Sequence, residues 1–304
     1  MPGFSNFQFD TLSFWLGFLA ASLAWWLLQK IRPAVPRLVE QIRHQLRQNR
    51  RKSGDRVEGA LRRDVLRRAQ GMHLAAPLFA LDDVLVQPLL IAPPPALVTP
   101  GQATPNTIAN QVIPYLPDWP EVTAQYPVHQ LHPAEALQNG ARVAVIGQPG
   151  SGKTVLLASL ASQAARQLAL AGGLEQKLPV LVHIVDVPLD GGDWKADPLL
   201  PLIKTVSGQS SVLIQPQIPR SLRAAAADGR LLLLVDGLDE IHPRELAGAV
   251  AWLSALGAQF AGLSLLVAAS PETMDGLSGA GFLPMTVAAW NVRAKELFLK
   301  RWAA

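Results

Sequence analysis

The sequence predicts an α/β fold, in which a parallel sheet is flanked by helices and preceded by one N-terminal transmembrane helix and a Pro-rich linker. Three observations predict it. From residue 134 onwards, short apolar strands alternate with helical patterns, which is typical of a parallel sheet. A Gly-rich turn ending in Lys-Thr joins the first strand and the first helix of that region. Near the N-terminus, eighteen residues run without a charge.

The alternating region, residues 134–304, contains the elements on which the fold prediction depends. Apolar runs predict strands at Arg142–Ile146, Val180–Val187, Leu231–Val235 and Leu263–Ala269. Helical patterns cover Gly152–Ala171, Leu199–Val206, Pro219–Ala227, Glu245–Phe260 and Ala294–Trp302. The strand at Leu231–Val235 is so apolar that we expect it to be central and covered on both faces.

The uncharged stretch Thr11–Leu28 is near the lower length limit for a helix that spans a bilayer. Basic residues follow at once from Lys30, whereas none precedes the stretch. The positive-inside rule then puts the N-terminus outside and the rest of the chain in the cytosol. We therefore predict a single-pass anchor in the cell membrane over residues 1–30. The alternative is a buried core helix.

Residues 31–75 form a basic juxtamembrane segment with a helical pattern. Residues 1–75 hold thirteen Lys or Arg against five acidic residues, although the whole chain carries a net charge of only +4. Apolar residues recur at i, i+4 spacing at Val57, Leu61, Val65 and Ala69. Three interpretations stay open: a solvated helix, contact with anionic lipid headgroups, and self-association. Beside an anchor, phospholipid is a simpler partner than nucleic acid.

Prolines recur through residues 76–133, at a density that blocks helix interiors and central strands. We expect an extended linker there that packs along the next domain. A domain boundary near residue 130 follows, with residues 134–304 as a domain of their own.

Composition excludes some classes of site. The chain has no Cys, which excludes disulfides and thiolate metal sites. Its six His residues show no paired metal-ligand spacing. Only 16% of residues are charged, against about 25% in an ordinary soluble domain, so some segment is unusually apolar.

The turn after the first strand matches the phosphate-loop pattern G-x-x-x-x-G-K-[ST] at every position. It consists of Gly147, Gln148, Pro149, Gly150, Ser151, Gly152, Lys153 and Thr154. The glycines let backbone N–H groups curl around a phosphate, and the next helix points its positive dipole end at it. Lys153 supplies a point charge for the β- and γ-phosphate oxygens, and Thr154 offers a hydroxyl to Mg²⁺. We predict binding of a nucleoside triphosphate, with ATP and Mg²⁺ favoured.

An acidic motif follows the apolar strand Leu231–Val235. A charge at Asp236 is costly to bury unless it is paired or hydrogen-bonded, and we expect it to hold the metal together with Thr154. Asp239 and Glu240 come next, and one of them is placed to orient a water in line with the γ-phosphate, with Asp239 slightly favoured. The alternatives are a turn-capping role for Asp236 and two solvated loop acids.

The sequence LLLLVDGLDE, from Leu231 to Glu240, resembles the second nucleotide motif of NACHT domains, and GQPGSGKT resembles the first. The segment Leu283–Trp290, followed by a helix, also resembles the family pattern of a strand that leads into a helical subdomain. The similarity covers residues 135–304. It implies a P-loop NTPase that acts in signal transduction with slow turnover. Such proteins are closed with ADP and open with ATP, and many oligomerise when open.

Two features depart from the NACHT pattern. Family members continue into helical domains and a repeat sensor, whereas this sequence ends at Ala304, so we expect a C-terminally truncated domain. After the strand Leu263–Ala269, the family has an Arg that senses the γ-phosphate, and here Ser270 stands in its place. Because a Ser carries no charge, the resemblance implies nucleotide binding and leaves efficient hydrolysis open.

Two functions therefore compete. The first is a membrane-anchored regulatory NTPase, with the membrane, anionic headgroups and second copies of the chain as partners. The second is a nucleotide-gated scaffold that binds ATP without turnover, which Ser270 favours. A GTPase-like switch is less favoured, because the sequence has no Asn-Lys-x-Asp stretch for guanine recognition.

Overall fold

The structure is a computed structural model that describes residues 55–91 and 130–303, together with Trp15, Phe18, Leu19, Ser22 and Trp25. The predicted anchor Thr11–Leu28 lies outside the described residues except at those five positions, which are helical and exposed. Within the described parts of the chain, no helix is both long enough and apolar enough to cross a membrane. The chain divides into two compact units, residues 1–55 and 56–304, and the second holds the sheet.

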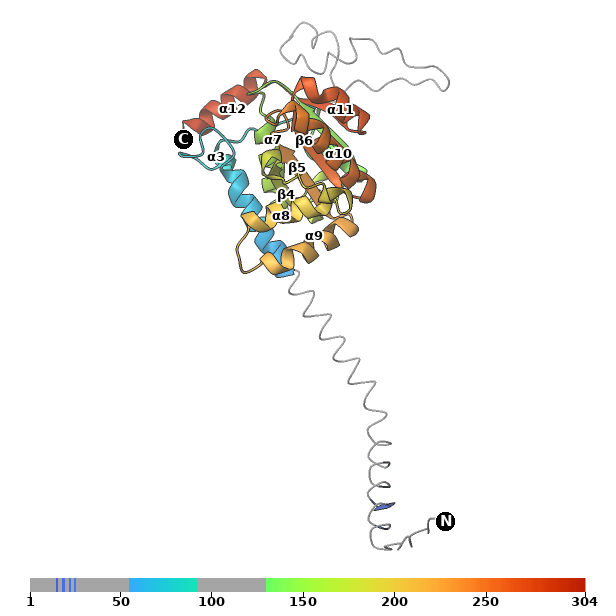
Figure 1. The fold of residues 1–304 in the computed structure, drawn as a ribbon. Coiled ribbons are helices and arrows are strands. Elements are labelled where there is room, and N and C mark those ends of the chain that lie inside the picture. The colour runs from blue at the N-terminus through green and yellow to red at the C-terminus, as the bar shows by residue number, and fades with distance from the viewer. Residues whose placement is uncertain are drawn as a thin grey trace, which may run out of the picture. The chain divides into compact units, whose positions relative to one another are not determined.

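A sheet of seven strands forms the centre of the described domain, in the order β2-β1-β7-β3-β6-β5-β4 (Figure 1). The five strands from β7 to β4 are parallel, whereas β1 and β2 are antiparallel additions at one edge. The strands are β1 Leu90–Ile91, β2 Gln130–Leu131, β3 Arg142–Ile146, β4 Leu178–His183, β5 Leu231–Asp236, β6 Ser264–Ala269 and β7 Leu283–Val287. The predicted α/β class with a largely parallel sheet is confirmed.

Helices cover both faces of this sheet (Figure 1). The helices of the described domain are one over residues 55–70, α3 Leu81–Val84, α6 Pro133–Ala136, α7 Lys153–Ala165, α8 Leu199–Gln209, α9 Ile218–Ala227, α10 Pro243–Gln259, α11 Met274–Gly279 and α12 Val292–Trp302, of which α12 buries no residue. Helix α7 packs on one face, and α8 to α11 pack on the other. Short 3₁₀ turns join several of these elements.

Strand β5 shows why the sheet needs both layers. Leu232 and Leu234 pack into the core under α7, whereas Leu231, Leu233 and Val235 pack into the core under α8 to α10. Alternate residues of a strand point to opposite faces of the sheet. Since both faces are covered by helices, each of these side chains is fully buried. The expectation of a doubly covered strand is confirmed.

Two predicted elements end earlier than the sequence indicates. The helix expected to reach Ala171 ends at Ala165, because Gln167 adopts a left-handed backbone with φ of 56°. The strand expected to reach Val187 ends at His183, where the chain turns into a 3₁₀ helix at Ile184–Asp186. Both differences lie at element ends, where apolar periodicity carries little information.

The helix over residues 55–70 is part of the domain core. Its apolar residues are all buried: Val57, Leu61, Val65 and Ala69. Val57 and Leu61 join the core on one face of the sheet, and Val65 and Ala69 join the core on the other. The helix therefore passes the sheet at its β4 edge, and the interpretation as a solvated juxtamembrane helix does not hold for these residues.

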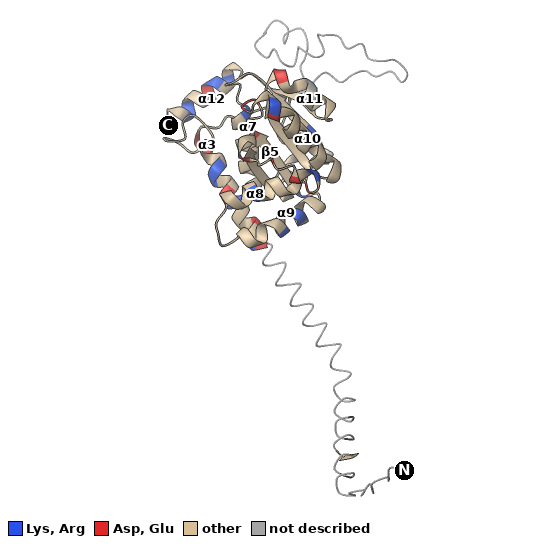
Figure 2. Cartoon of the chain, in the orientation of Figure 1, with Lys and Arg blue, Asp and Glu red and all other residues tan. Residues whose placement is uncertain are grey.

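Arginines fix this helix to the edge of the sheet. Arg62 donates to the backbone carbonyls of Ala164 at 2.6 Å and Lys177 at 2.8 Å, and Arg68 donates to the carbonyl of Leu181 in β4 at 2.6 Å. Burial lowers the pKa of Arg62, and the nearby Glu58 opposes that shift. Figure 2 shows basic residues on this helix as well as on α9 and α12. Since β4 is the terminal strand of the described sheet, the arginines also cover its unpaired edge.

The ends of the predicted Pro-rich linker contribute to the same sheet. Strand β1 pairs with β7 through Leu90 opposite Val287, and β2 pairs with β1 through Leu131 opposite Leu90. Residues 92–129, which hold most of the prolines, lie outside the described residues. The described ends of the linker thus lie at one edge of the sheet as short strands, and the extended linker between them stays a prediction.

Candidate nucleotide-binding site

The phosphate loop joins β3 to α7 and requires glycine at defined places. Gly150 and Gly152 have φ angles of +83° and +89°, which side chains other than glycine rarely adopt. A Cβ on Gly147 would lie 2.5 Å from the Ser151 hydroxyl oxygen, so a larger residue there would force the Ser151 side chain to move. Helix α7 begins within the motif, at Lys153, and its N-terminal N–H groups face the turn before it. The loop therefore has the form of an anion cradle.

Lys153 is the buried cation of this loop, with 7% of its surface exposed. Its ammonium donates to the carbonyl of Gly147 at 2.7 Å and to that of Gln148 at 3.2 Å. The same ammonium lies 3.4 Å from Oδ2 of Asp239. Lys153 thus connects the phosphate loop with the acidic motif, as the sequence prediction requires of two parts of one site.

The acidic motif lies at the carboxyl end of β5. Asp236 is the last residue of that strand and is only 5% exposed. Asp239 and Glu240 follow in a turn that is closed by a hydrogen bond from the Glu240 N–H to the Gly237 carbonyl at 2.9 Å. Strand β6 lies between β3 and β5, so the loop and the acids converge from two strands that are not neighbours.

A cavity of about 750 Å³ brings the predicted groups together. Its lining includes Gln148, Pro149, Gly150, Gly152, Lys153, Thr154, Asp236, Asp239, Glu240 and Ser270. Gly147 and Ser151 are the members of the phosphate loop that do not line it. The structure therefore places every other predicted binding, metal and catalytic residue on one cavity.

Sequence reasoning missed residues that line the same cavity from outside the two motifs. Met72, His73 and Leu74 follow the helix over residues 55–70 and reach the phosphate loop. The Nε2 atom of His73 is buried and has no hydrogen-bond partner among the described residues. A buried polar atom without a partner is unusual in a folded protein. No pattern in the sequence marks these positions, because they lie some 75 residues before the loop.

A second cavity, of about 580 Å³, adjoins the first. The two share His73, Leu74, Gly150, Gly152 and Val155. The far side of the second cavity carries the rings of Trp290, Phe298 and Trp302, with centroids 5.0 Å apart for the first pair and 5.6 Å for the second. An apolar, aromatic space beside a phosphate cradle suits a flat heterocycle.

The lining of the cavity is rich in acidic residues. Ser270, at the place of the Arg of the NACHT pattern, hydrogen-bonds the exposed Glu272, and this bond lowers the pKa of the Glu272 carboxyl. Glu272 joins Asp236, Asp239 and Glu240 on the lining, against the single buried cation Lys153. A polyphosphate placed there needs a further positive charge.

The donor set fits Mg²⁺ rather than a cation held by protein alone. Among the described residues, no group of three or more His, Cys, Asp or Glu is arranged to hold a metal ion. Asp236 and the Thr154 hydroxyl both line the cavity, and these are one carboxylate and one hydroxyl of the kind that P-loop proteins use. Mg²⁺ commonly takes one or two protein oxygens and completes its shell with phosphates and water. The residues present therefore fit the metal.

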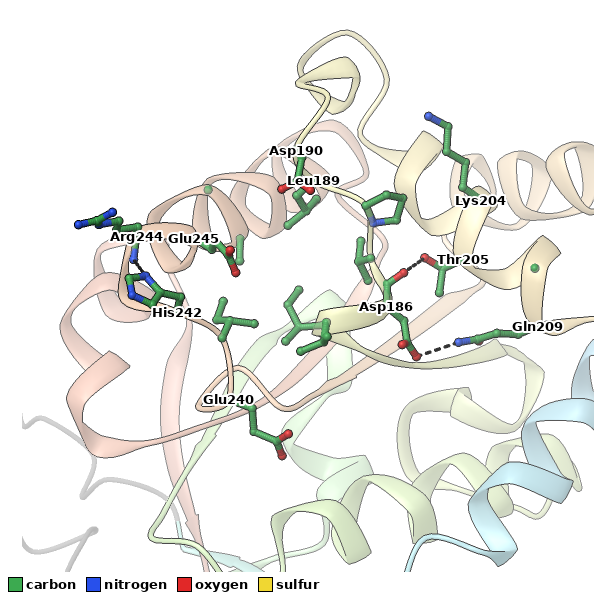
Figure 3. Close-up of a pocket in the computed structure, with 18 residues that line it drawn as sticks. Asp186, Leu189, Asp190, Lys204, Thr205, Gln209, Glu240, His242, Arg244 and Glu245 are labelled. Carbon is green, nitrogen blue, oxygen red and sulfur yellow. Dashed lines mark hydrogen bonds between the residues drawn. The ribbon is translucent and has the colours of Figure 1, made fainter.

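A larger hollow of about 1030 Å³ lies beside the site and shares Glu240 with it (Figure 3). In Figure 3, the Thr205 hydroxyl donates to the backbone carbonyl of Asp186, and the Gln209 side-chain amide donates to the Asp186 carboxylate. No residue of the phosphate loop lines this hollow. Its size alone does not make it the nucleotide site, because the phosphate-binding chemistry belongs to the smaller cavity.

A largely parallel sheet, a phosphate loop before α7 and an acid at the end of β5 define the class of P-loop NTPases. Within that class, the family model described as "NACHT domain" matches residues 141–284. This stretch of the chain is therefore similar to NACHT domains. A comparison with curated proteins gives no match. The family is one of nucleotide-binding signalling NTPases, so the resemblance seen in the two motifs is confirmed.

Proposed function

We propose that this protein is a membrane-anchored, ATP-binding regulatory NTPase that acts as a signalling switch. The observation that carries the nucleotide part is the convergence of Lys153, Thr154 and Asp236 on one cavity with the phosphate loop. Neither motif requires the other for the fold, since β3 and β5 are not paired with each other. Their meeting at one cavity is therefore best explained by a shared ligand.

Each residue has a defined task in this proposal. The loop N–H groups and Lys153 bind the phosphates, with Lys153 exchanging its carbonyl partners for the β- and γ-oxygens. Thr154 and Asp236 hold Mg²⁺, which when bound supplies the positive charge that the acidic end of the cavity lacks. Asp239 and Glu240 are the candidates to orient a water toward the γ-phosphate.

The adjoining aromatic cavity supports a purine nucleotide as the ligand. Trp290 and Phe298 provide flat apolar surfaces, and His73 stands at the boundary between the two cavities with an unpartnered Nε2. The imidazole ring of His73 lines both cavities and adds a further flat surface for a nucleoside. The preference for ATP over GTP rests on the absence of a guanine-reading Asn-Lys-x-Asp stretch.

Slow hydrolysis is part of the proposal, and binding without hydrolysis is the alternative. Ser270 cannot supply the charge that an Arg would bring to the γ-phosphate, and its partner Glu272 adds a negative charge. Both features favour long-lived occupancy, which suits a switch. ATP hydrolysis above background that disappears in the double variant Asp239→Ala, Glu240→Ala would exclude the scaffold alternative.

The membrane part of the proposal rests on the uncharged segment Thr11–Leu28 and the basic residues that follow it. Arg62 and Arg68 are hydrogen-bonded within the domain, which leaves the basic residues before position 55 and the exposed Arg56, Arg63 and Arg67 to contact anionic headgroups. The anchor is supported if the full chain sediments with membranes, stays bound in high salt and is released by detergent. Complete release by salt alone argues against it.

A further inference from the structure

The register of the sheet places His183 beside the acidic motif. It is the last residue of β4, and it pairs in register with Asp236, the last residue of β5. The two side chains therefore emerge at the same carboxyl edge, where the turn with Asp239 and Glu240 begins. The sequence motifs do not include His183, because it belongs to a different strand.

The imidazole of His183 packs against the backbone of that turn. A Cβ built on Gly237 would collide with the His183 ring, and Gly237 also has a φ of +77°. Glycine is thus needed at position 237 both for its backbone angle and for the space that the ring occupies. The ring in turn limits how the turn can shift.

Partners of the two acids of the turn differ. Asp239 lies 3.4 Å from the Lys153 ammonium, and Glu240 has its Oε2 atom 3.4 Å from Nε2 of His183. Among the described residues, no other hydrogen-bond or ion-pair partner is assigned to the Glu240 carboxylate, whose side chain is 66% exposed. An exposed Glu without a partner samples several rotamers, so His183 is the group that restricts it.

We propose that His183 is a positioning residue that orients Glu240 for hydrolysis of the bound nucleotide, an inference that rests on the proposed NTPase function. The structure puts Nε2 of His183 3.4 Å from Oε2 of Glu240; in the proposed reaction its N–H donates to that oxygen, which leaves Oε1 to accept a proton from the attacking water. The water oxygen bonds to the γ-phosphorus, and the bond from that phosphorus to the β–γ bridging oxygen breaks. The nucleoside diphosphate leaves with that electron pair, and the water proton passes through Glu240 to solvent.

This proposal changes the assignment within the acidic pair. Lys153 already engages Asp239 on the phosphate side, which suits Asp239 to a role close to the phosphates and the metal. Glu240 is held from the opposite side by an imidazole and is the better candidate to activate the water. The sequence alone slightly favoured Asp239 for that task.

The test compares three variants of His183 in the full-length chain, by the rate constant of ATP hydrolysis and by the Kd for Mg-ATP. His183→Ala removes ring and donor, His183→Phe keeps a ring against Gly237 without a donor, and His183→Gln keeps a donor. We expect kcat to fall about tenfold in the Ala and Phe variants with Kd unchanged, and the Gln variant to recover most of the rate. Circular dichroism and thermal melting establish that each variant is folded.

The decisive step repeats the His183→Phe change in a Glu240→Gln background. If His183 acts through Glu240, the second change has no further effect on kcat. An equal loss in both backgrounds, or a loss of Mg-ATP affinity that matches the loss of rate, shows a structural role and overturns the proposal. A wild-type chain that binds Mg-ATP without hydrolysing it also overturns it and leaves nucleotide binding intact. Failure of the wild type to bind any nucleotide instead contradicts the proposed function itself.

Discussion

The Lys153 ammonium lies 3.4 Å from the Asp239 carboxylate, in a setting where the lysine is only 7% exposed. This contact joins the phosphate loop after β3 to the acidic turn after β5, across the intervening strand β6. A bound polyphosphate would compete for the same ammonium. The two motifs are therefore coupled, and a ligand that takes Lys153 changes what Asp239 contacts.

Replacing Asp236 tests the metal role. In Asp236→Asn, we expect Mg²⁺ to lose most of its effect on ATP affinity, because an amide oxygen is a weaker ligand for a hard cation than a carboxylate. Titration of ATP with Mg²⁺ and with EDTA, for wild type and variant, measures this. Asp193→Asn, at an exposed site away from the cavity, is the matched control. An unchanged Mg²⁺ dependence in Asp236→Asn would rule out this ligand assignment.

Restoring the charge that Ser270 lacks should alter turnover. We expect Ser270→Arg to raise the rate of ATP hydrolysis about tenfold or more, since it places a cation at the γ-phosphate end and removes the hydrogen bond to Glu272. Single-turnover release of phosphate measures the effect. The control Ser270→Gln has a similar donor without charge. If both variants match the wild type, position 270 does not limit hydrolysis.

Replacing His73 tests whether this residue contacts the nucleoside or the phosphates of the bound nucleotide. We expect His73→Ala to weaken Mg-ATP binding roughly tenfold, because the imidazole ring that lines both cavities loses its contact with the nucleoside. Binding of inorganic tripolyphosphate should be unaffected, because it does not reach the aromatic cavity. Calorimetric titration of both ligands gives the comparison. Equal losses for the two ligands would place His73 on the phosphates instead.

Arg62 should matter for stability rather than for nucleotide affinity. Its removal in Arg62→Ala takes away the guanidinium donors to the carbonyls of Ala164 and Lys177, of which Ala164 keeps the Gln167 N–H, and we expect a loss of about 1–3 kcal/mol in the free energy of unfolding. Arg63→Ala, an exposed neighbour on the same helix, is the control and should change little. Urea unfolding followed by circular dichroism measures both. Equal stability of the two variants would show that the helix over residues 55–70 is not fixed through Arg62.

The sequence allowed the parallel sheet and both nucleotide motifs to be predicted, because these depend on local patterns. Strand β3 agrees with its predicted bounds, and Leu231–Val235 is covered on both faces as expected. The position of Val57 to Ala69 could not be predicted, since an apolar stripe does not specify what buries it. The roles of His73 and His183 were also hidden, because each reaches the site through tertiary packing alone.

Binding of Mg-ATP by wild type and by Lys153→Ala tests the central claim most directly, with Lys195→Ala as an exposed control outside the cavity. Isothermal titration of each full-length protein gives the Kd. We predict saturable binding for wild type and for Lys195→Ala, and a loss of at least about a hundredfold in Lys153→Ala, because the buried ammonium is the loop's only side-chain cation among the described residues. An equal Kd in Lys153→Ala and wild type would contradict the assignment of this cavity as the nucleotide site.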